Sequence, residues 1–257
     1  MPDITRKDSL ITDYMNLDSD GKKSYFYNTA KYETDSAYAV DKKMETLIRG
    51  KKYDRNLRYV IEKDYVGQSS SFYIKFVNLN IVIPETEKPK WKLENEYRKI
   101  NDLNCQKAIA NYKGRIWEAW FAPYPITDGP YKFDGLPGLI VKLHDIKKEH
   151  SFDLIQIKKI NSIFSLLPRN NKKMTKEEYQ KAINGHVVNF ANDAESTIAN
   201  VKAGTIAVRM KDGYMAQFNY NDLKKNTKSG ETINEEIDRR LNKRNSNPIE
   251  LDHKDKN

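Results

Sequence analysis

The sequence predicts an α+β fold, in which one curved antiparallel β-sheet, shaped like a half-barrel, carries two or three helices packed against it. Three observations lead to this class. Short runs of alternating apolar and polar residues, separated by turn residues, fill residues 57–160, a pattern typical of antiparallel strands. A corner dense in proline and glycine interrupts residues 117–145. A capping box at Thr175 to Glu178 precedes apolar residues at helical spacing, which predicts a helix.

The chain of 257 residues is predicted to form a single domain over 1–257, since no break in composition divides it. Within it, residues 1–27 form an N-terminal hairpin, 57–160 the core antiparallel sheet with the corner, and 161–257 a helical and extended C-terminal part. The sequence has no continuous apolar run of about 18 residues, so no transmembrane segment is expected.

The N-terminal part is predicted to begin with two strands, over 8–17 and 23–28, joined by a turn at Ser19-Asp20-Gly21. Tyr38, Met44 and Leu47 lie among charged residues in the stretch 29–49, which favours a surface helix.

The predicted sheet follows. Residues 57–65 read as a strand, and 71–84 as one long central strand that is apolar on both faces. Three further segments, 96–100, 104–113 and 115–122, predict an antiparallel meander.

Side-chain alternation assigns faces to the last strands. On 115–122, Trp117, Ala119 and Phe121 share one face, while Ile116, Glu118 and Trp120 share the other. After the corner, Leu139, Val141 and Leu143 point one way, and 152–160 is the expected hairpin partner.

The C-terminal part is predicted to contain two helices around an extended stretch. The helices span 175–196 and 231–244, and the extended residues 205–220 turn at Asp212-Gly213.

The corner is the most unusual segment of the chain. Proline fixes φ and removes a backbone donor, and glycine is the default residue where φ must be positive. We therefore expect a stiff turn that launches the strand after it, so its glycines and prolines are first of all structural. The motif residues are Gly135, Leu136, Pro137, Gly138, Leu139 and Ile140.

Together with its flanks, this segment resembles the GLPGLI family of Bacteroidetes cell-envelope proteins. The matching residues are Cys105 to Ala108, Gly114-Arg115, the aromatic strand from Trp117 to Phe121, Pro125-Ile126, Gly129 to Phe133, the motif itself, Asp145, and Asn247 to Leu251. The resemblance implies an antiparallel β-rich protein of the periplasm or cell envelope, made with a signal peptide that does not appear at Met1. It implies no catalytic residue.

An irregular segment on a rigid scaffold can also contact a ligand or partner. Aromatic side chains and one cation make this alternative concrete, although aromatic residues are more often core. The weak candidates for a ligand- or partner-binding site are Arg115, Trp117, Trp120, Phe121, Tyr124, Tyr131 and Phe133.

Charge and chemistry-bearing residues exclude several classes of function. The net charge of +9 comes from lysines mixed with acids, which predicts solvated surface charge and no nucleic-acid partner. Cys105 is the single cysteine, expected to be a buried thiol. His144, Asp145 and His150 are too few for a convincing metal site, so no metal or cofactor is predicted.

Three functions remain, and the third is an enzyme of unknown class. The first is a non-enzymatic envelope protein that holds a hydrophobic or peptide-like ligand in its curved sheet. The second is an accessory module that docks on an outer-membrane protein through the corner.

Overall fold

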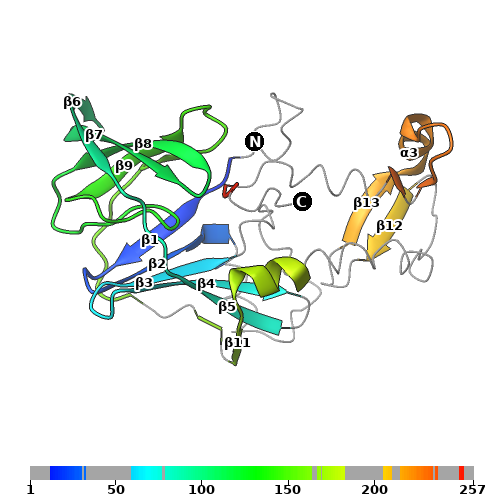
Figure 1. Ribbon diagram of the computed structural model, residues 1–257, viewed down its shortest axis with the longest axis horizontal. Helices are drawn as coiled ribbons and strands as arrows, with labels where there is room; N and C mark the ends of the chain where they lie inside the picture. The colour runs from blue at the N-terminus through cyan, green and yellow to red at the C-terminus, as the bar shows by residue number, and fades with distance from the viewer. Residues whose placement is uncertain are drawn as a thin grey trace.

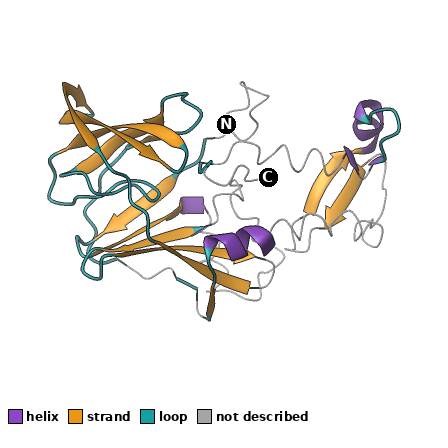
Figure 2. Cartoon of the chain, viewed as in Figure 1, coloured by secondary structure: helices purple, strands orange, loops and turns teal. Residues whose placement is uncertain are grey.

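The computed structural model shows an α+β chain in which β-sheet predominates (Figure 2). It describes residues 12–30, 32, 59–76, 79–163, 167–168, 170–182, 205–209, 215–233, 235–236 and 249–251. The predicted class is confirmed. The single sheet predicted over 57–160 is instead divided between two large sheets, neither of which closes into a barrel, and the described residues also form a separate two-stranded sheet.

The first large sheet, sheet A, has the strand order β1-β2-β3-β4-β5-β11. Its first five strands are antiparallel neighbours, whereas β11 pairs with β5 in parallel. The strands are β1 (Met15–Ser19), β2 (Lys23–Asn28), β3 (Val60–Asp64), β4 (Ser69–Phe76), β5 (Leu79–Glu85) and β11 (Asn171–Lys173).

The second, sheet B, is fully antiparallel with the order β10-β9-β8-β7-β6. Its turns are short, and non-glycine residues accept positive φ there: Asn101 (48°) and Asp102 (63°) before β7, and Lys113 (53°) before β8. The strands are β6 (Lys92–Ile100), β7 (Leu103–Tyr112), β8 (Arg115–Ala122), β9 (Leu139–Asp145) and β10 (Ser151–Asp153).

The third sheet, β12 (Thr205–Arg209) with β13 (Met215–Asn219), leads into helix α3 (Tyr220–Asn226). These elements lie apart from the two large sheets (Figure 1). The two strands confirm the extended prediction over 205–209 and 215–219, and the turn predicted at Asp212-Gly213 lies outside the described residues. Tyr220, predicted to be extended, instead begins α3, which was not predicted.

The main core lies between the two large sheets. Phe26 and Ile61 from sheet A join Trp117, Phe121 and Leu143 from sheet B in one buried cluster. Phe133, Leu136 and Ile140 belong to the same cluster. The corner therefore fills the space between the sheets, which explains its apolar composition.

Lys63 of sheet A fixes the corner to the core. Its buried ammonium donates to the Asp128 carboxylate (2.8 Å), the Gly129 carbonyl (2.7 Å) and the Phe133 carbonyl (2.9 Å). Three acceptors satisfy the three donors of the ammonium. One side chain thus joins β3 to the two ends of the loop 128–133.

Two glycines of the corner are required sterically. A Cβ on Gly138 would lie 2.0 Å from the Ala122 carbonyl oxygen, and one on Gly129 would lie 2.5 Å from Ile140 Cδ1. The Gly138 amide also donates to the Leu136 carbonyl (2.8 Å), a tight three-residue turn. The stiff turn predicted at this motif is what the backbone forms.

Several predicted elements need correction. The segment 71–84 is a hairpin of β4 and β5, because the chain reverses between Phe76 and Leu79; Asn78, a turn-type residue, was the overlooked signal. Val141 faces the outer cluster with Trp120 instead of joining Leu143, because the β8–β9 register shifts between Trp120 and Phe121. The strand predicted over 152–160 ends at Asp153.

The helix predictions are confirmed where the structure describes them. Residues 176–182 are helical, and Thr175 and Glu178 exchange both hydrogen bonds of the capping box (2.8 and 3.1 Å). Helical residues begin at Thr29 and again at Ile233; the remainder of the helices predicted over 29–49, 175–196 and 231–244 lies outside the described residues. None of the described helices is long and apolar enough to cross a membrane.

Candidate functional site

The C-terminal segment Ile249–Leu251, called the terminal segment below, is bound against the β7–β8 turn. The Leu251 amide donates to the Lys113 carbonyl (2.8 Å), and Arg115 Nε donates to the Ile249 carbonyl (3.0 Å). The Ile249 side chain packs on the main core cluster. Main-chain and side-chain contacts therefore hold consecutive residues, as in the binding of a short peptide.

The middle residue of this segment, Glu250, is held by three donors. Its Oε1 accepts from Lys132 Nζ (2.6 Å) and from the Tyr131 hydroxyl (2.5 Å), and Lys176 Nζ lies 2.7 Å from its Oε2. Burial alone would raise the pKa of the Glu250 carboxyl, but Lys132 and Lys176 outweigh it and set the pKa at about 2. Glu250 is therefore held as a charged carboxylate near neutral pH.

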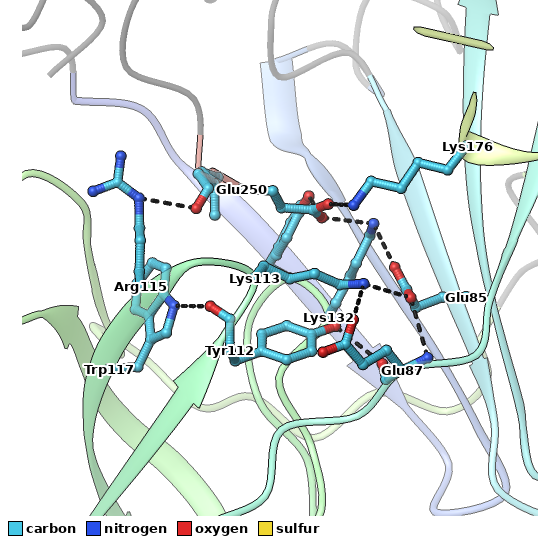
Figure 3. A network of polar contacts seen from close by, with 11 residues as sticks. Glu85, Glu87, Tyr112, Lys113, Arg115, Trp117, Lys132, Lys176 and Glu250 are labelled. Carbon is cyan, nitrogen blue, oxygen red and sulfur yellow. Dashed lines mark hydrogen bonds and ion pairs between the residues drawn. The ribbon is translucent and has the colours of Figure 1, made fainter. Parts of the chain in front are cut away.

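A wider chain of ion pairs holds these lysines in place (Figure 3). Lys132 also contacts Glu85 (2.8 Å), and Lys113 bridges Glu85 (3.1 Å) and Glu87 (2.7 Å). The Lys113 and Lys132 side chains are only 5% and 6% exposed. Buried charges are tolerated when paired and hydrogen-bonded, so Glu85 and Glu87 keep Lys113 and Lys132 in the interior. These four residues, with Tyr131, Lys176 and Arg115, form the cationic cradle around the terminal segment.

Arg115 is fixed by acids on its other side. Its Nη1 contacts the Glu149 carboxylate (2.6 Å) and the Asp145 carboxylate (3.4 Å), and Asp145 also accepts from the His150 amide (2.7 Å). Burial and the neighbouring Arg115 lower the pKa of His150 to about 4. Arg115 is thus paired structurally and presents its remaining edge to the terminal segment.

The cradle draws on distant parts of the chain. Glu85 ends β5 and Glu87 follows it, Lys113 lies in the β7–β8 turn, Arg115 begins β8, and Lys132 comes from the corner. Lys176 is the first residue of a helix. The corner, which packs between the sheets, supplies both Tyr131 and Lys132.

The predicted site residues divide into four groups. Arg115 and Tyr131 contact the terminal segment, while Trp117, Phe121 and Phe133 are buried in the main core. Trp120 lies on the opposite face of sheet B. The Arg98 guanidinium lies over its ring, with Arg98 Cζ 3.6 Å from the ring centroid of Trp120. Tyr124 is partly exposed in the corner.

Sequence reasoning missed the lysines that hold the corner and the terminal segment because it placed them in solvent. Three of these lysines, Lys63, Lys113 and Lys132, are at most 8% exposed, which corrects that prediction for them. Lys132 between two aromatic residues of an apolar corner was the available signal. Among the described residues, no group of three or more His, Cys, Asp or Glu could hold a metal ion.

Comparisons with known proteins inform the fold only. No family model matches the chain, and no curated protein matches it. The chain is similar to the crystal structure of PNGF-II in the P21 space group, with a TM-score of 0.51 and 15% sequence identity over 78% of this chain. A second crystal form of PNGF-II, in space group C2, gives a TM-score of 0.46 and 16% identity over 67% of this chain.

The matched region makes up only 37% of the PNGF-II chain in the first crystal form and 29% in the second. At this level of identity the likeness shows a shared fold, and functions are not transferred by fold alone.

Proposed function

We propose that the chain is a non-enzymatic binding protein of the cell envelope that holds a peptide-like ligand between its two sheets. The ligand class is a short peptide of apolar–acidic–apolar sequence. One observation carries the proposal: the cradle binds Ile249–Leu251 through an apolar side chain, a carboxylate with three donors, and two main-chain contacts. The envelope location follows from the resemblance to GLPGLI proteins, and the half-barrel curvature of the sheets is part of the same proposal.

The electrostatics of the cradle favour binding over proton transfer. The pKa of Glu250 is about 2, with Lys132 and Lys176 overcoming its burial. The pKa of Lys113 is raised, since Glu87 and Glu85 outweigh the effect of burial. General acids and bases work best with pKa values near the operating pH, whereas these groups stay charged. Fixed charges of this kind suit recognition of an acidic side chain.

The test uses the full chain with its own segment displaced. Glu250→Arg places a cation against Lys132 and Lys176, so the tethered segment is repelled while the cradle keeps every other residue. A fluorescently labelled peptide with the sequence of residues 247–252 is then titrated, and fluorescence anisotropy reports binding. We expect saturable binding to Glu250→Arg, and weaker binding to the unaltered chain, whose own segment competes.

A matched peptide carrying glutamine at the position of Glu250 is the control. Loss of the carboxylate removes the charge-assisted bonds from Lys132 and Lys176, each worth about 1.5–3 kcal/mol, so at least a tenfold weaker affinity is expected. Equal affinity for both peptides, or no binding to a folded Glu250→Arg chain, would refute the proposal.

The second candidate function, a module that docks on an outer-membrane protein through the corner, is favoured by the exposure of Pro123 and Pro125 beside the partly exposed Tyr124. Photo-crosslinking from position 124 in the envelope tests it. A single crosslinked membrane protein, obtained while the peptide fails to bind, would favour this alternative.

A further inference from the structure

The donors that hold the Glu250 carboxylate are divided between its two oxygens. Oε1 accepts from the Tyr131 hydroxyl (2.5 Å) and lies 2.6 Å from Lys132 Nζ, whereas Oε2 lies 2.7 Å from Lys176 Nζ. Figure 3 shows both lysines directed at this carboxylate. Where the carboxylate of a ligand can lie therefore depends on how firmly each of these donors is held.

The two donors to Oε1 come from one turn of the corner. The Phe133 amide donates to the Pro130 carbonyl (3.1 Å), so Tyr131 and Lys132 are the central residues of a four-residue turn. Tyr131 has a positive φ of 52° and Lys132 does not. Glycine is preferred at the first central position of such a turn, and a bulky residue rarely adopts this conformation. Strained positions of this kind cluster at ligand-binding sites.

Both donors to Oε1 are also held by other residues. Tyr131 is 6% exposed, and its ring packs edge-on against Tyr59 with 5.6 Å between the ring centroids. The Lys132 side chain is 6% exposed, and its ammonium also contacts Glu85 (2.8 Å) and lies 5.0 Å from the centroid of the Phe72 ring. Neither donor can therefore readily follow a carboxylate on a shorter side chain.

The main chain on both sides of the carboxylate is fixed as well. Arg115 Nε donates to the Ile249 carbonyl (3.0 Å), and the Leu251 amide donates to the Lys113 carbonyl (2.8 Å). An aspartate between these two residues would lack one methylene group, which withdraws the carboxylate by up to about 1.5 Å. The donors now at 2.5 and 2.6 Å would then lie up to about 4 Å away, beyond the length of a hydrogen bond.

Lys176 differs from these two donors, because its side chain is 23% exposed and belongs to the first residue of a helix. A flexible lysine side chain that is partly in solvent can follow a shorter carboxylate. An aspartate would thus keep its contact with Lys176, but it would leave the Tyr131 hydroxyl and one donor of Lys132 buried without a partner. Sites built to hydrogen-bond a group discriminate against ligands that leave such buried donors unpaired.

We propose that the cradle selects glutamate over aspartate at the middle position of its peptide ligand, and that the Tyr131 hydroxyl is a determinant of this selectivity. The inference rests on the proposed function and narrows its ligand class from apolar–acidic–apolar to apolar–glutamate–apolar. The two acids carry the same charge near neutral pH, so the reach of the side chain, and not its charge, decides between them.

Two peptides of equal charge test the selectivity on the full chain carrying Glu250→Arg. One has the sequence of residues 247–252, and the other has aspartate at the position of Glu250. Fluorescence anisotropy gives the affinity of each labelled peptide. We expect the glutamate peptide to bind at least about tenfold more tightly than the aspartate peptide.

Tyr131→Phe, made in the same chain, tests the role of the hydroxyl. It should weaken binding of the glutamate peptide severalfold and leave that of the aspartate peptide nearly unchanged, so the ratio of the two affinities falls. A merely structural role of Tyr131 would weaken both peptides alike. Tyr97→Phe, at a tyrosine on β6 that is 68% exposed, is the matched control and should leave the ratio unchanged. Circular dichroism confirms that the variants are folded.

The outcomes separate this inference from the proposed function. Equal affinity for the two peptides, or a ratio that Tyr131→Phe leaves unchanged, would overturn the selectivity while peptide binding itself stands. Binding of neither peptide to the folded Glu250→Arg chain would overturn the proposed function, and the selectivity with it.

Discussion

Replacing Lys63 with methionine tests how the corner is held. The side chain stays similar in length, but its ammonium disappears and with it three bonds of 2.7–2.9 Å to Asp128, Gly129 and Phe133. Lys63 is 1% exposed and Asp128 is 1% exposed, so solvent replaces neither partner. Removing one member of a buried ion pair costs about 3–5 kcal/mol, because the remaining charge has no compensation.

The free energy of unfolding is measured by urea titration, with tryptophan fluorescence as the probe, since Trp117 packs against Phe133 of the corner (4.6 Å between ring centroids). For a chain of this size the loss corresponds to a fall in melting temperature of about 10 °C. Lys90→Met, at an exposed lysine, is the control and should change stability by less than about 0.5 kcal/mol.

A double variant separates the lost bonds from the orphaned charge. In K63M/D128N the carboxylate is neutral, so part of the stability should return relative to K63M. The reasoning is refuted if K63M unfolds at the same urea concentration as the unaltered chain, or if the double variant is no more stable than the sum of its two single changes predicts.

Three further predictions follow from individual side chains. Gly138→Ala should destabilise the chain by several kcal/mol, because its Cβ would lie 2.0 Å from a main-chain oxygen; Gly135→Ala, at φ 86° with open space around it, should cost only about 1 kcal/mol, and both are compared by urea titration. Glu250 has a folded pKa of about 2 against an ordinary 4.5, so its contribution of about 3 kcal/mol is present above pH 4.5 and lost as the pH falls toward 2. Glu250→Gln should therefore flatten the acid limb of a stability–pH curve, and an unchanged slope would contradict the pairing. Burial raises the pKa of the Cys105 thiol, so a thiol reagent should modify it only after unfolding; rapid modification of the native chain would contradict that burial.

Local chemistry in the sequence predicted the local structure well. The hairpin around Gly21 and the meander turns at Asn101-Asp102 and Lys113 follow from turn residues between alternating runs. The capping box of Thr175 and Glu178 forms as expected. These features depend on neighbours within a few residues, which a single sequence displays directly.

Contacts between residues far apart in the chain could not be predicted from the sequence. Lys63 meets Asp128 across 65 residues and Arg115 meets Ile249 across 134. Composition alone therefore placed the lysines in solvent and gave Arg115 no partner. The division into two sheets depends on which strands find each other, and the β8–β9 register shift moves Val141 to the other face. Of the predicted binding residues, only Arg115 and Tyr131 contact the terminal segment within the described residues. Their distance from that segment in the sequence gives no sign of this contact.

The most direct measurement on the central claim is hydrogen exchange of the unaltered chain with and without excess free peptide of residues 247–252. The Leu251 amide is bound to the Lys113 carbonyl and should be protected when the tethered segment occupies the cradle. If the cradle is an exchangeable peptide site, added peptide will speed exchange at Leu251 while the amides of β7 and β8 stay protected. Exchange at Leu251 that does not respond to saturating peptide would contradict the claim, and would make the terminal segment a fixed part of the fold.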